Sequence, residues 1–197
     1  MKKNIILLFL FIVSIASAQR YKVLSGDLKN LKGISEYNLT FDYSEQKIQG
    51  FETEEAYLKE KMDKRKDKDG AAEQFKKDWF GDRENKYEPK FIEYFNKRFE
   101  KGEIKAGKNL AVKYSMDIKT TWIYPGYNVV AAVEPAKISA IVTIKETDNP
   151  SKILIAIEFD KTIGLEPGQF DFDQGYRIAG AYERLAKNLV MQMKRFL

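Results

Sequence analysis

Three segments in which apolar and polar residues alternate constrain the fold more than any other feature of this chain. They span residues 110–122, 138–144 and 153–159. A period of two places every second side chain on the same face of a strand, so each segment predicts a strand with one apolar face. The sequence DNPS at 148–151 has the composition of a tight turn, which predicts that the last two strands form an antiparallel hairpin.

A fourth strand and three helices are predicted before these segments. Residues 37–43 alternate in the same way. Thr53 precedes two glutamates, which is typical of a helix N-terminus, and this helix would continue toward Lys68. A second, short helix would end at Gly81, and a third would cover 89–99, with Pro89 in its first turn and an apolar stripe behind it.

The C-terminal segment predicts the most regular helix of the chain. From Gly175 to Met193, apolar residues recur on one helical face, and Asp171 or Asp173 would cap the N-terminus. The small residues Gly175 and Ala179 would let this helix lie close to the sheet. The predicted fold is therefore α+β: a two-layer sandwich with a mainly antiparallel four-stranded sheet and helices on one face, in the order β-ααα-βββ-α.

Residues 1–18 (MKKNIILLFLFIVSIASA) have the parts of a secretory signal peptide. Lys2 and Lys3 precede an apolar stretch at 5–15, and Ala-Ser-Ala at 16–18 forms a small-residue cleavage site. The apolar stretch is too short to span a bilayer, which takes about 20 residues. We expect cleavage before Gln19, a single domain over 19–197 without a transmembrane segment, and a periplasmic or extracellular location.

Two missing residue types exclude several functions. The 197 residues contain no histidine and no cysteine. Serine-hydrolase triads, thiol catalysis, disulfides and zinc sites in their usual forms are therefore excluded. We expect no cofactor and no metal site. The 34 basic residues are spread among 29 acidic ones, so the net charge of +5 does not indicate a nucleic-acid partner.

An aromatic segment at the end of the long strand is the first candidate site. It reads WIYPGYN at 122–128 and contains Trp122, Tyr124, Tyr127 and Asn128. Aromatic side chains bury much area with few torsions to fix, so this segment is a candidate for binding a sugar or a partner protein. Alternatively, Trp122 completes the core face of the strand and the tyrosines only pack the loop.

A carboxylate-rich segment is the second candidate site. The sequence GLEPGQFDFD at 164–173 contains Glu166, Asp171 and Asp173. A close pair of carboxylates is what a glycoside hydrolase needs, and such a loop also suits calcium. Aspartates before a helix, however, usually accept hydrogen bonds from its free N–H groups, and capping is the simpler interpretation here.

Two segments carry a resemblance to known proteins. KTTWIYPGYN at 119–128 and DFDQGYRI at 171–178, together with the Ala18-Gln19 signal end, resemble an uncharacterised family of small secreted proteins of Bacteroidota. This resemblance implies no catalytic residue. The element order is also similar to the periplasmic α/β modules of envelope-assembly systems, the curli-export and Tol systems, which are interaction modules.

The expected function is an exported, noncatalytic envelope module that binds a protein or a cell-wall component. Its first candidate contact is the connection after Trp122, and its expected partner is an envelope protein or a glycan. The alternative is a carboxylate-dependent enzyme that acts on glycans through residues 164–173. The oligomeric state stays open.

Overall fold

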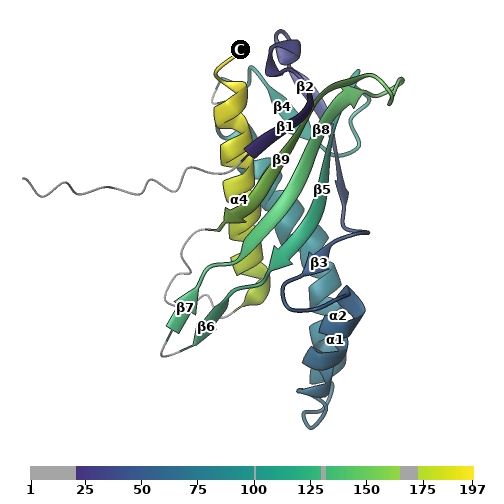
Figure 1. Ribbon diagram of the computed structural model, residues 1–197, viewed down its shortest axis with the longest axis vertical. Coiled ribbons are helices and arrows are strands. Elements are labelled where there is room, and N and C mark those ends of the chain that lie inside the picture. Colours follow the sequence, from purple (N-terminus) through teal and green to yellow (C-terminus); the bar gives the residue numbers. More distant parts are fainter. Residues whose placement is uncertain (1–20, 100, 130–131, 165–172) are drawn as a thin grey trace, which may run out of the picture.

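The structure, a computed structural model, describes residues 21–99, 101–129, 132–164 and 173–197. Figure 1 shows the elements of the chain. The strands are β1 (Tyr21–Gly26), β2 (Glu36–Asp42), β3 (Lys47–Ile48), β4 (Lys105–Gly107), β5 (Tyr114–Tyr124), β6 (Tyr127–Val129), β7 (Ala132–Glu134), β8 (Lys137–Glu146) and β9 (Ile153–Ile163). The helices are the 3₁₀ turn η1 (Leu28–Leu31), α1 (Glu54–Asp63), α2 (Ala71–Asp82), the π-helical η2 (Arg83–Tyr87), α3 (Glu88–Asn96) and α4 (Gln174–Met193).

The main sheet is mixed and has seven strands within the described residues, so the prediction of a mainly antiparallel four-stranded sheet was wrong. The strand order is β1-β9-β8-β5-β2-β4, and β3 also pairs with β5. The pairs β1–β9, β8–β9 and β5–β8 are antiparallel. The strand β2 runs parallel to both β5 and β4, and β3 runs parallel to β5.

The differences from the prediction have identifiable causes. The helices between β2 and β5 form a long crossover, and such a connection returns the chain in the parallel direction. The strands β3 and β4 have only two and three residues, too few to show an alternating pattern. All residues of β1 are exposed and its pairing contains an irregularity, so it shows no apolar face. The hairpin of β8 and β9 was predicted and is confirmed.

The second and third predicted helices form one continuous helix, α2–η2–α3. In the π-helical part, the N–H of Glu88 donates to the carbonyl of Arg83, five residues earlier. Pro89 follows directly. Proline has no N–H, and its ring clashes with the carbonyl four residues before it in a regular α-helix. The wider π turn lets the helix continue past a proline that was expected to begin a new one.

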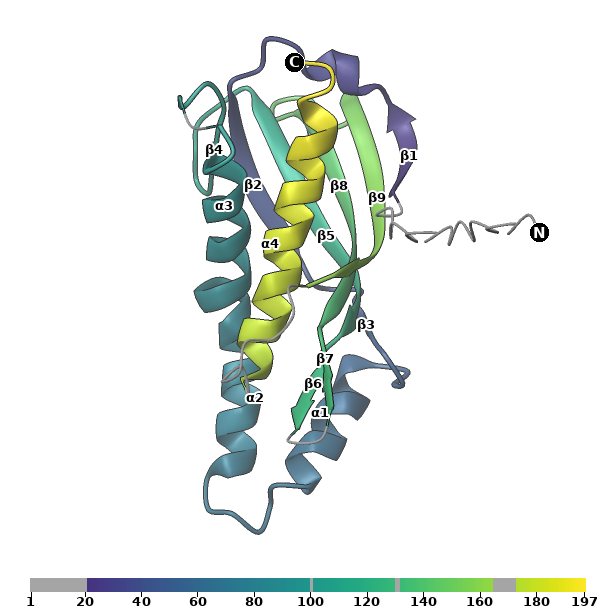
Figure 2. The ribbon, with the colours of Figure 1, turned by 90° about the vertical axis from the view of Figure 1, so that its left-hand side faces the viewer.

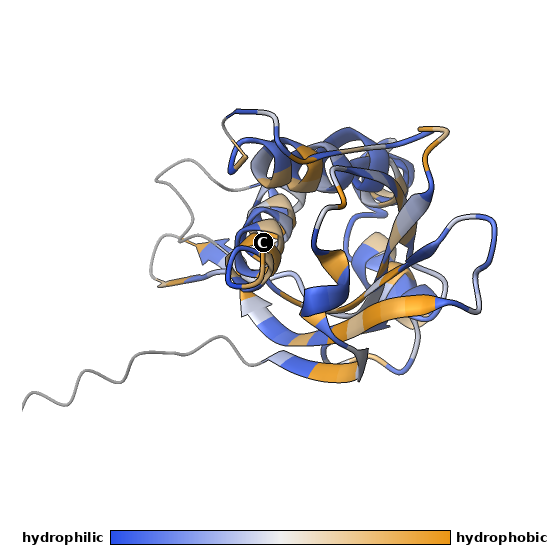
Figure 3. Ribbon diagram, turned by 90° about the horizontal axis from the view of Figure 1, so that it is seen from above, coloured by the Kyte–Doolittle hydropathy of each residue, from blue (hydrophilic) through white to orange (hydrophobic). Residues whose placement is uncertain are grey.

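The hydrophobic core lies between the sheet and the layer of α3 and α4, which lie side by side across one face (Figure 2). Figure 3 shows the two layers from above, with α4 ending at the C label. The alternating faces predicted for these strands are confirmed for β8, for β9 from Ile155 onward and for β5 from Met116 to Thr120, because their core-facing residues are buried. Strands and helices contribute these side chains: Met116, Ile118, Val142, Ile144, Ile157, Phe159, Phe91, Phe95, Ile178, Leu185 and Leu189.

Two hairpins project beyond the main sheet at the same end of the molecule (Figures 1 and 2). One is the helical hairpin of α1 and α2, and the other is the two-stranded hairpin of β6 and β7. Thr53 caps α1 as predicted, because its Oγ1 accepts the N–H of Ala56 at 3.1 Å.

Candidate functional site

The aromatic candidates lie at a break in the pairing of β5 with β8. Thr120 pairs with Ala140 but Trp122 pairs with Ser139, so Thr121 is an extra residue that forms a β-bulge. Thr120 and Ile123 are both buried on the core face. An extra residue reverses the alternation, so Trp122 turns to the outer face, away from the helices. Trp122 is therefore not part of the buried core.

Trp122 and Tyr124 form an aromatic pair on this outer face. Their ring centroids lie 6.4 Å apart and their planes are inclined by 22°. The ammonium group of Lys161 lies 5.6 Å from the centroid of the Trp122 ring, and that of Lys137 lies 5.2 Å from the centroid of the Tyr124 ring. Each ring thus has a cation over its face, an arrangement that the ring quadrupole favours.

A carboxylate holds the tyrosine of the aromatic pair in place. The hydroxyl of Tyr124 donates to Oε2 of Glu134 at 2.6 Å, and Nζ of Lys137 donates to Oε1 of the same carboxylate at 2.7 Å. Burial and the neighbouring Glu134 carboxylate raise the pKa of Tyr124 to about 12. The hydrogen bonds from Lys137 and Tyr124 lower the pKa of Glu134. The phenol is therefore neutral and the carboxylate ionised at neutral pH.

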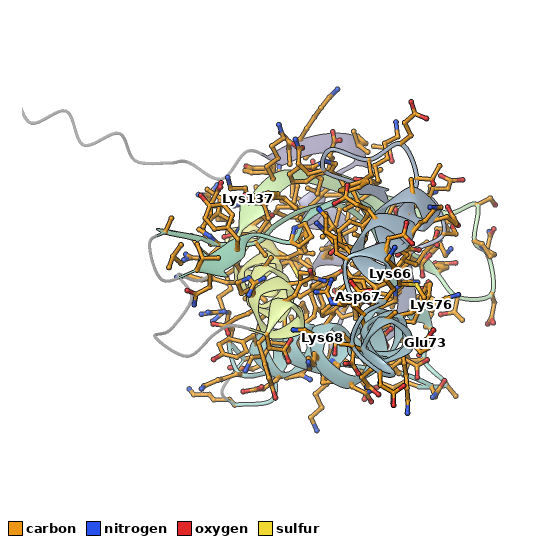
Figure 4. All side chains as sticks on the ribbon, turned by 90° about the horizontal axis from the view of Figure 1, so that it is seen from below. Lys66, Asp67, Lys68, Glu73, Lys76 and Lys137 are labelled. Atoms are coloured by element: carbon orange, nitrogen blue, oxygen red, sulfur yellow. The ribbon has the colours of Figure 1, made fainter. Side chains whose placement is uncertain are left out.

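A second irregularity, in the pairing of β8 with β9, positions the other lysine. Ser139 Oγ donates to Asp160 Oδ1 at 3.0 Å and accepts the N–H of Lys161 at 2.9 Å. The backbone of Lys161 has a positive φ of 46°. Sequence reasoning did not place Asp160 or Lys161 at the site, because neither the bulge nor the positive φ has a signal in the residue pattern. Figure 4, from below, shows Lys137 apart from the labelled side chains of the α1–α2 hairpin.

The β6–β7 hairpin continues the outer surface beyond the aromatic pair. It contains Tyr127 and Asn128, the other two predicted binding residues. Three large apolar side chains on it are exposed: Tyr127 by 42%, Val129 by 54% and Val133 by 51%. The hairpin therefore presents apolar surface to solvent, which on a folded protein commonly marks a contact site when it is contiguous.

The turn before this hairpin is fixed to the helical layer. Gly126 has a φ of +64°, and a Cβ there would overlap the carbonyl of Glu134, so the turn requires glycine. From α4, Nε of Arg177 donates to the carbonyl of Pro125 at 3.3 Å. The base of the hairpin is thus held in place by the Gly126 turn and by the hydrogen bond from Arg177.

The structure assigns a capping role to the one carboxylate of the second candidate site that it describes. Glu166 and Asp171 lie outside the described residues. Asp173 Oδ1 accepts the N–H of Gly175 at 2.6 Å, and its Oδ2 accepts a hydrogen bond from Lys86 Nζ at 2.7 Å. Burial alone would raise the pKa of Asp173, but the hydrogen bonds from Lys86 and Gly175 outweigh it and lower the pKa.

Lys86 also pairs with a second carboxylate, that of Asp82, at 2.8 Å. Burial raises the pKa of Asp82. A Cβ on Gly175 would overlap the Asp82 carboxylate, so this glycine permits close contact between α4 and the α2–η2 helix. The prediction that Gly175 lets α4 lie close to the sheet was therefore wrong. The cluster joins the start of α4 to the long helix.

Several lysines on the outer, polar face of the sheet are paired with acids. Lys119 contacts Glu45 at 2.5 Å, Lys113 contacts Glu146 at 3.8 Å, and Lys145 pairs with Asp117. Each of these three lysines therefore has a carboxylate partner. Among the described residues, no group of three or more acidic side chains is arranged to hold a metal ion. No helix in the described part of the chain has the length and apolar character needed to cross a membrane.

Comparison of the chain with protein-family models, with curated proteins and with solved structures found no match.

Proposed function

We propose that this protein is an exported, noncatalytic module of the cell envelope that binds another protein through the β6–β7 hairpin and the adjoining aromatic pair. The observation that carries the proposal is the exposure of Tyr127, Val129 and Val133 on a hairpin that projects beyond the sheet. Interface centres are enriched in aromatic side chains, and apolar residues in such a position bury area when a partner docks.

A protein suits this surface better than a glycan does. A sugar ring stacks on a free aromatic face, but ammonium groups already lie over the rings of both Trp122 and Tyr124. The exposed side chains of Val129 and Val133 offer no hydrogen bonds to sugar hydroxyls. Lys137, Lys161 and Glu134 surround the aromatic pair with charges that would form a polar rim around an apolar contact.

The proposed export and the proposed interaction role rest on two further sequence features. Residues 1–18 motivate the periplasmic or extracellular location. The resemblance of 119–128 and 171–178 to small secreted proteins of Bacteroidota, and of the element order to envelope-assembly modules, agrees with an interaction role. The glycan-acting alternative would use Asp173 as one of its carboxylates. Both oxygens of that carboxylate are already engaged, one in capping α4 and the other in the ion pair with Lys86.

Site-specific photo-crosslinking in the native host tests the proposal. A crosslinking amino acid at Val129 is expected to give one dominant protein adduct, whereas the same group at Ile153, which is 45% exposed at the start of β9, gives none. Tyr127→Ser with Val133→Ser should abolish capture by the Val129 probe without changing the melting temperature.

The matched control replaces two equally exposed apolar residues elsewhere. Val23→Ser with Ile153→Ser removes comparable apolar surface at the β1 side of the sheet and should leave the adduct intact. Adducts of equal yield from both probe positions, or a glycan adduct from Val129, would contradict a protein partner at this hairpin.

A further inference from the structure

A groove between α3 and α4 lies on a different part of the surface from the aromatic pair. Its volume is about 300 Å³, and its lining residues are Tyr94, Lys97, Arg98, Val190, Met191 and Lys194. Three of these six side chains are cationic and none is acidic. The lining of the groove is therefore positively charged, although the chain as a whole carries nearly as many acidic as basic residues.

The cations of the groove differ in their pairing from the lysines of the outer sheet face. Among the described residues, no carboxylate forms an ion pair with Lys97, Arg98 or Lys194, whereas Lys113, Lys119 and Lys145 each contact an acid. The Nε atom of Arg98 is buried and has no hydrogen-bond acceptor. An anion entering the groove would thus meet cations that are not already neutralised by acids of the described chain.

The groove is held in shape by contacts between its two helices. Nζ of Lys194 donates to the carbonyl of Arg98 at 2.6 Å and lies 5.3 Å from the centroid of the Phe99 ring. The ammonium groups of Lys90 and Lys97 lie 5.1 Å and 5.5 Å from the centroid of the Tyr94 ring. The positive groups are therefore gathered around an aromatic side chain before any ligand binds.

Exposed apolar side chains in the lining of the groove and in the segment after α4 indicate which kind of anion would bind. Met191 is 49% exposed on α4, and Phe196 and Leu197, which follow α4, are also exposed. A small soluble anion would make no use of this apolar surface. Cations beside exposed apolar residues are the pattern of a protein surface that rests at the boundary between lipid headgroups and acyl chains.

We propose that the α3–α4 groove docks on a membrane surface by binding the phosphate of an anionic phospholipid, with Met191 entering the interfacial layer. Lys97, Arg98 and Lys194 supply the charge that complements the phosphate. The proposal is independent of the protein-binding hairpin, because the hairpin lies near the first residues of α4 and the groove lies near its last residues.

Co-sedimentation with lipid vesicles tests the proposal. The chain from Gln19 onward, which contains every described element, is mixed with phosphatidylglycerol vesicles and with phosphatidylcholine vesicles. Binding is expected to the first only and to weaken as salt is added. Lys97→Gln with Lys194→Gln should lower the partition coefficient about 30-fold, since each lysine near an anionic surface contributes about a factor of five to ten.

A charge-matched variant separates the groove from the general charge of the protein. Lys66→Gln with Lys68→Gln, labelled in Figure 4, removes the same two charges from the turn between α1 and α2, which Figures 1 and 2 show at the lower end of the molecule, and should lower binding by less than about threefold. Met191→Ser, which keeps every charge, should also weaken binding. Equal losses from the two lysine pairs, or no binding to phosphatidylglycerol vesicles at low salt, would overturn the proposal.

Inorganic phosphate distinguishes a membrane surface from a soluble ligand. Without vesicles, phosphate at millimolar concentration is expected to leave the melting temperature of the wild type and of Lys97→Gln/Lys194→Gln equally unchanged. Stabilisation of the wild type that the double variant lacks would assign the groove to a soluble phosphate and overturn the membrane assignment.

Discussion

Asp173 has two separable roles at the residue scale: it caps α4 and it pairs with Lys86. Its Oδ1 accepts the N–H of Gly175, and its Oδ2 accepts from Lys86. Asparagine caps a helix about as well as aspartate, but it carries no charge. The variants Asp173→Asn and Asp173→Ala therefore separate the ion pair from the cap.

We expect Asp173→Asn to lower the free energy of unfolding at pH 7 by about 0.5 kcal/mol, because the lost ion pair is partly exposed. Asp173→Ala should cost about 1 kcal/mol more, because the cap is lost as well. Urea unfolding at pH 7 measures both. Equal losses for Asn and Ala would show that the ion pair, and not the cap, is the main role of Asp173.

The pH dependence of the Asn variant follows from the pKa of Asp173, which the folded protein lowers. A carboxyl with a lowered pKa stabilises the folded state above its ordinary pKa, and this contribution disappears as the pH falls through the folded value. The difference between wild type and Asp173→Asn should therefore be constant above about pH 5 and shrink toward zero below the ordinary aspartate pKa. A difference that persists at pH 2.5 would contradict this assignment.

At the element scale, the bulge at Thr121 decides which face of β5 carries the aromatic pair. Deleting Thr121 would restore regular pairing, turn Trp122 and Tyr124 toward the core, and turn the buried Ile123 outward. We expect a loss of more than about 4 kcal/mol in urea unfolding, or no folded protein, because two large side chains must enter a filled core.

A substitution at the same position is the control for this deletion. Thr121→Ala keeps the register and removes one hydrogen bond, from its Oγ1 to the carbonyl of Ser139 at 3.2 Å. It should lower the free energy of unfolding by about 1 kcal/mol or less. Similar losses for the deletion and the substitution would show that the bulge does not set the orientation of the aromatic pair.

A comparison of these elements with the sequence shows which features of the fold could be predicted from local residue patterns and which could not. The strands with one buried face and the capped helices were predictable, because alternation, helical stripes and caps such as Thr53 are local signals. The parallel pairing of β2 with β5 was not, because it depends on contacts between distant segments. In the candidate site, the aromatic residues were found, but their orientation depends on a bulge that the residue pattern does not reveal.

At the scale of the whole molecule, Glu54 joins the projecting helical hairpin to the body. Its Oε1 accepts hydrogen bonds from Gln46 Nε2 and Trp79 Nε1, both at 2.5 Å, and it forms an ion pair with Arg83. These partners come from the loop before β3, from α2 and from η2. One carboxylate thus connects four segments of the chain.

Glu54→Ala should leave the donors of Trp79 and Arg83 without this acceptor and lower the free energy of unfolding by about 2 to 3 kcal/mol. Hydrogen exchange should then show α1 opening more readily than the main sheet. Glu52→Ala, at an exposed position before α1, should change neither quantity. Equal acceleration of exchange in α1 and in β8 would show that the hairpin and the sheet still open as one unit.

The strand pairing also determines when this protein can fold. Residues 21–99 contain β1, β2 and β3, and no two of these strands pair with each other. Their partners are β9, β5 and β4, all of which come later in the chain. Pairing between distant segments slows folding. A chain that emerges N-terminus first therefore carries unpaired strands until β9 arrives, and during that interval the open strand edges favour aggregation.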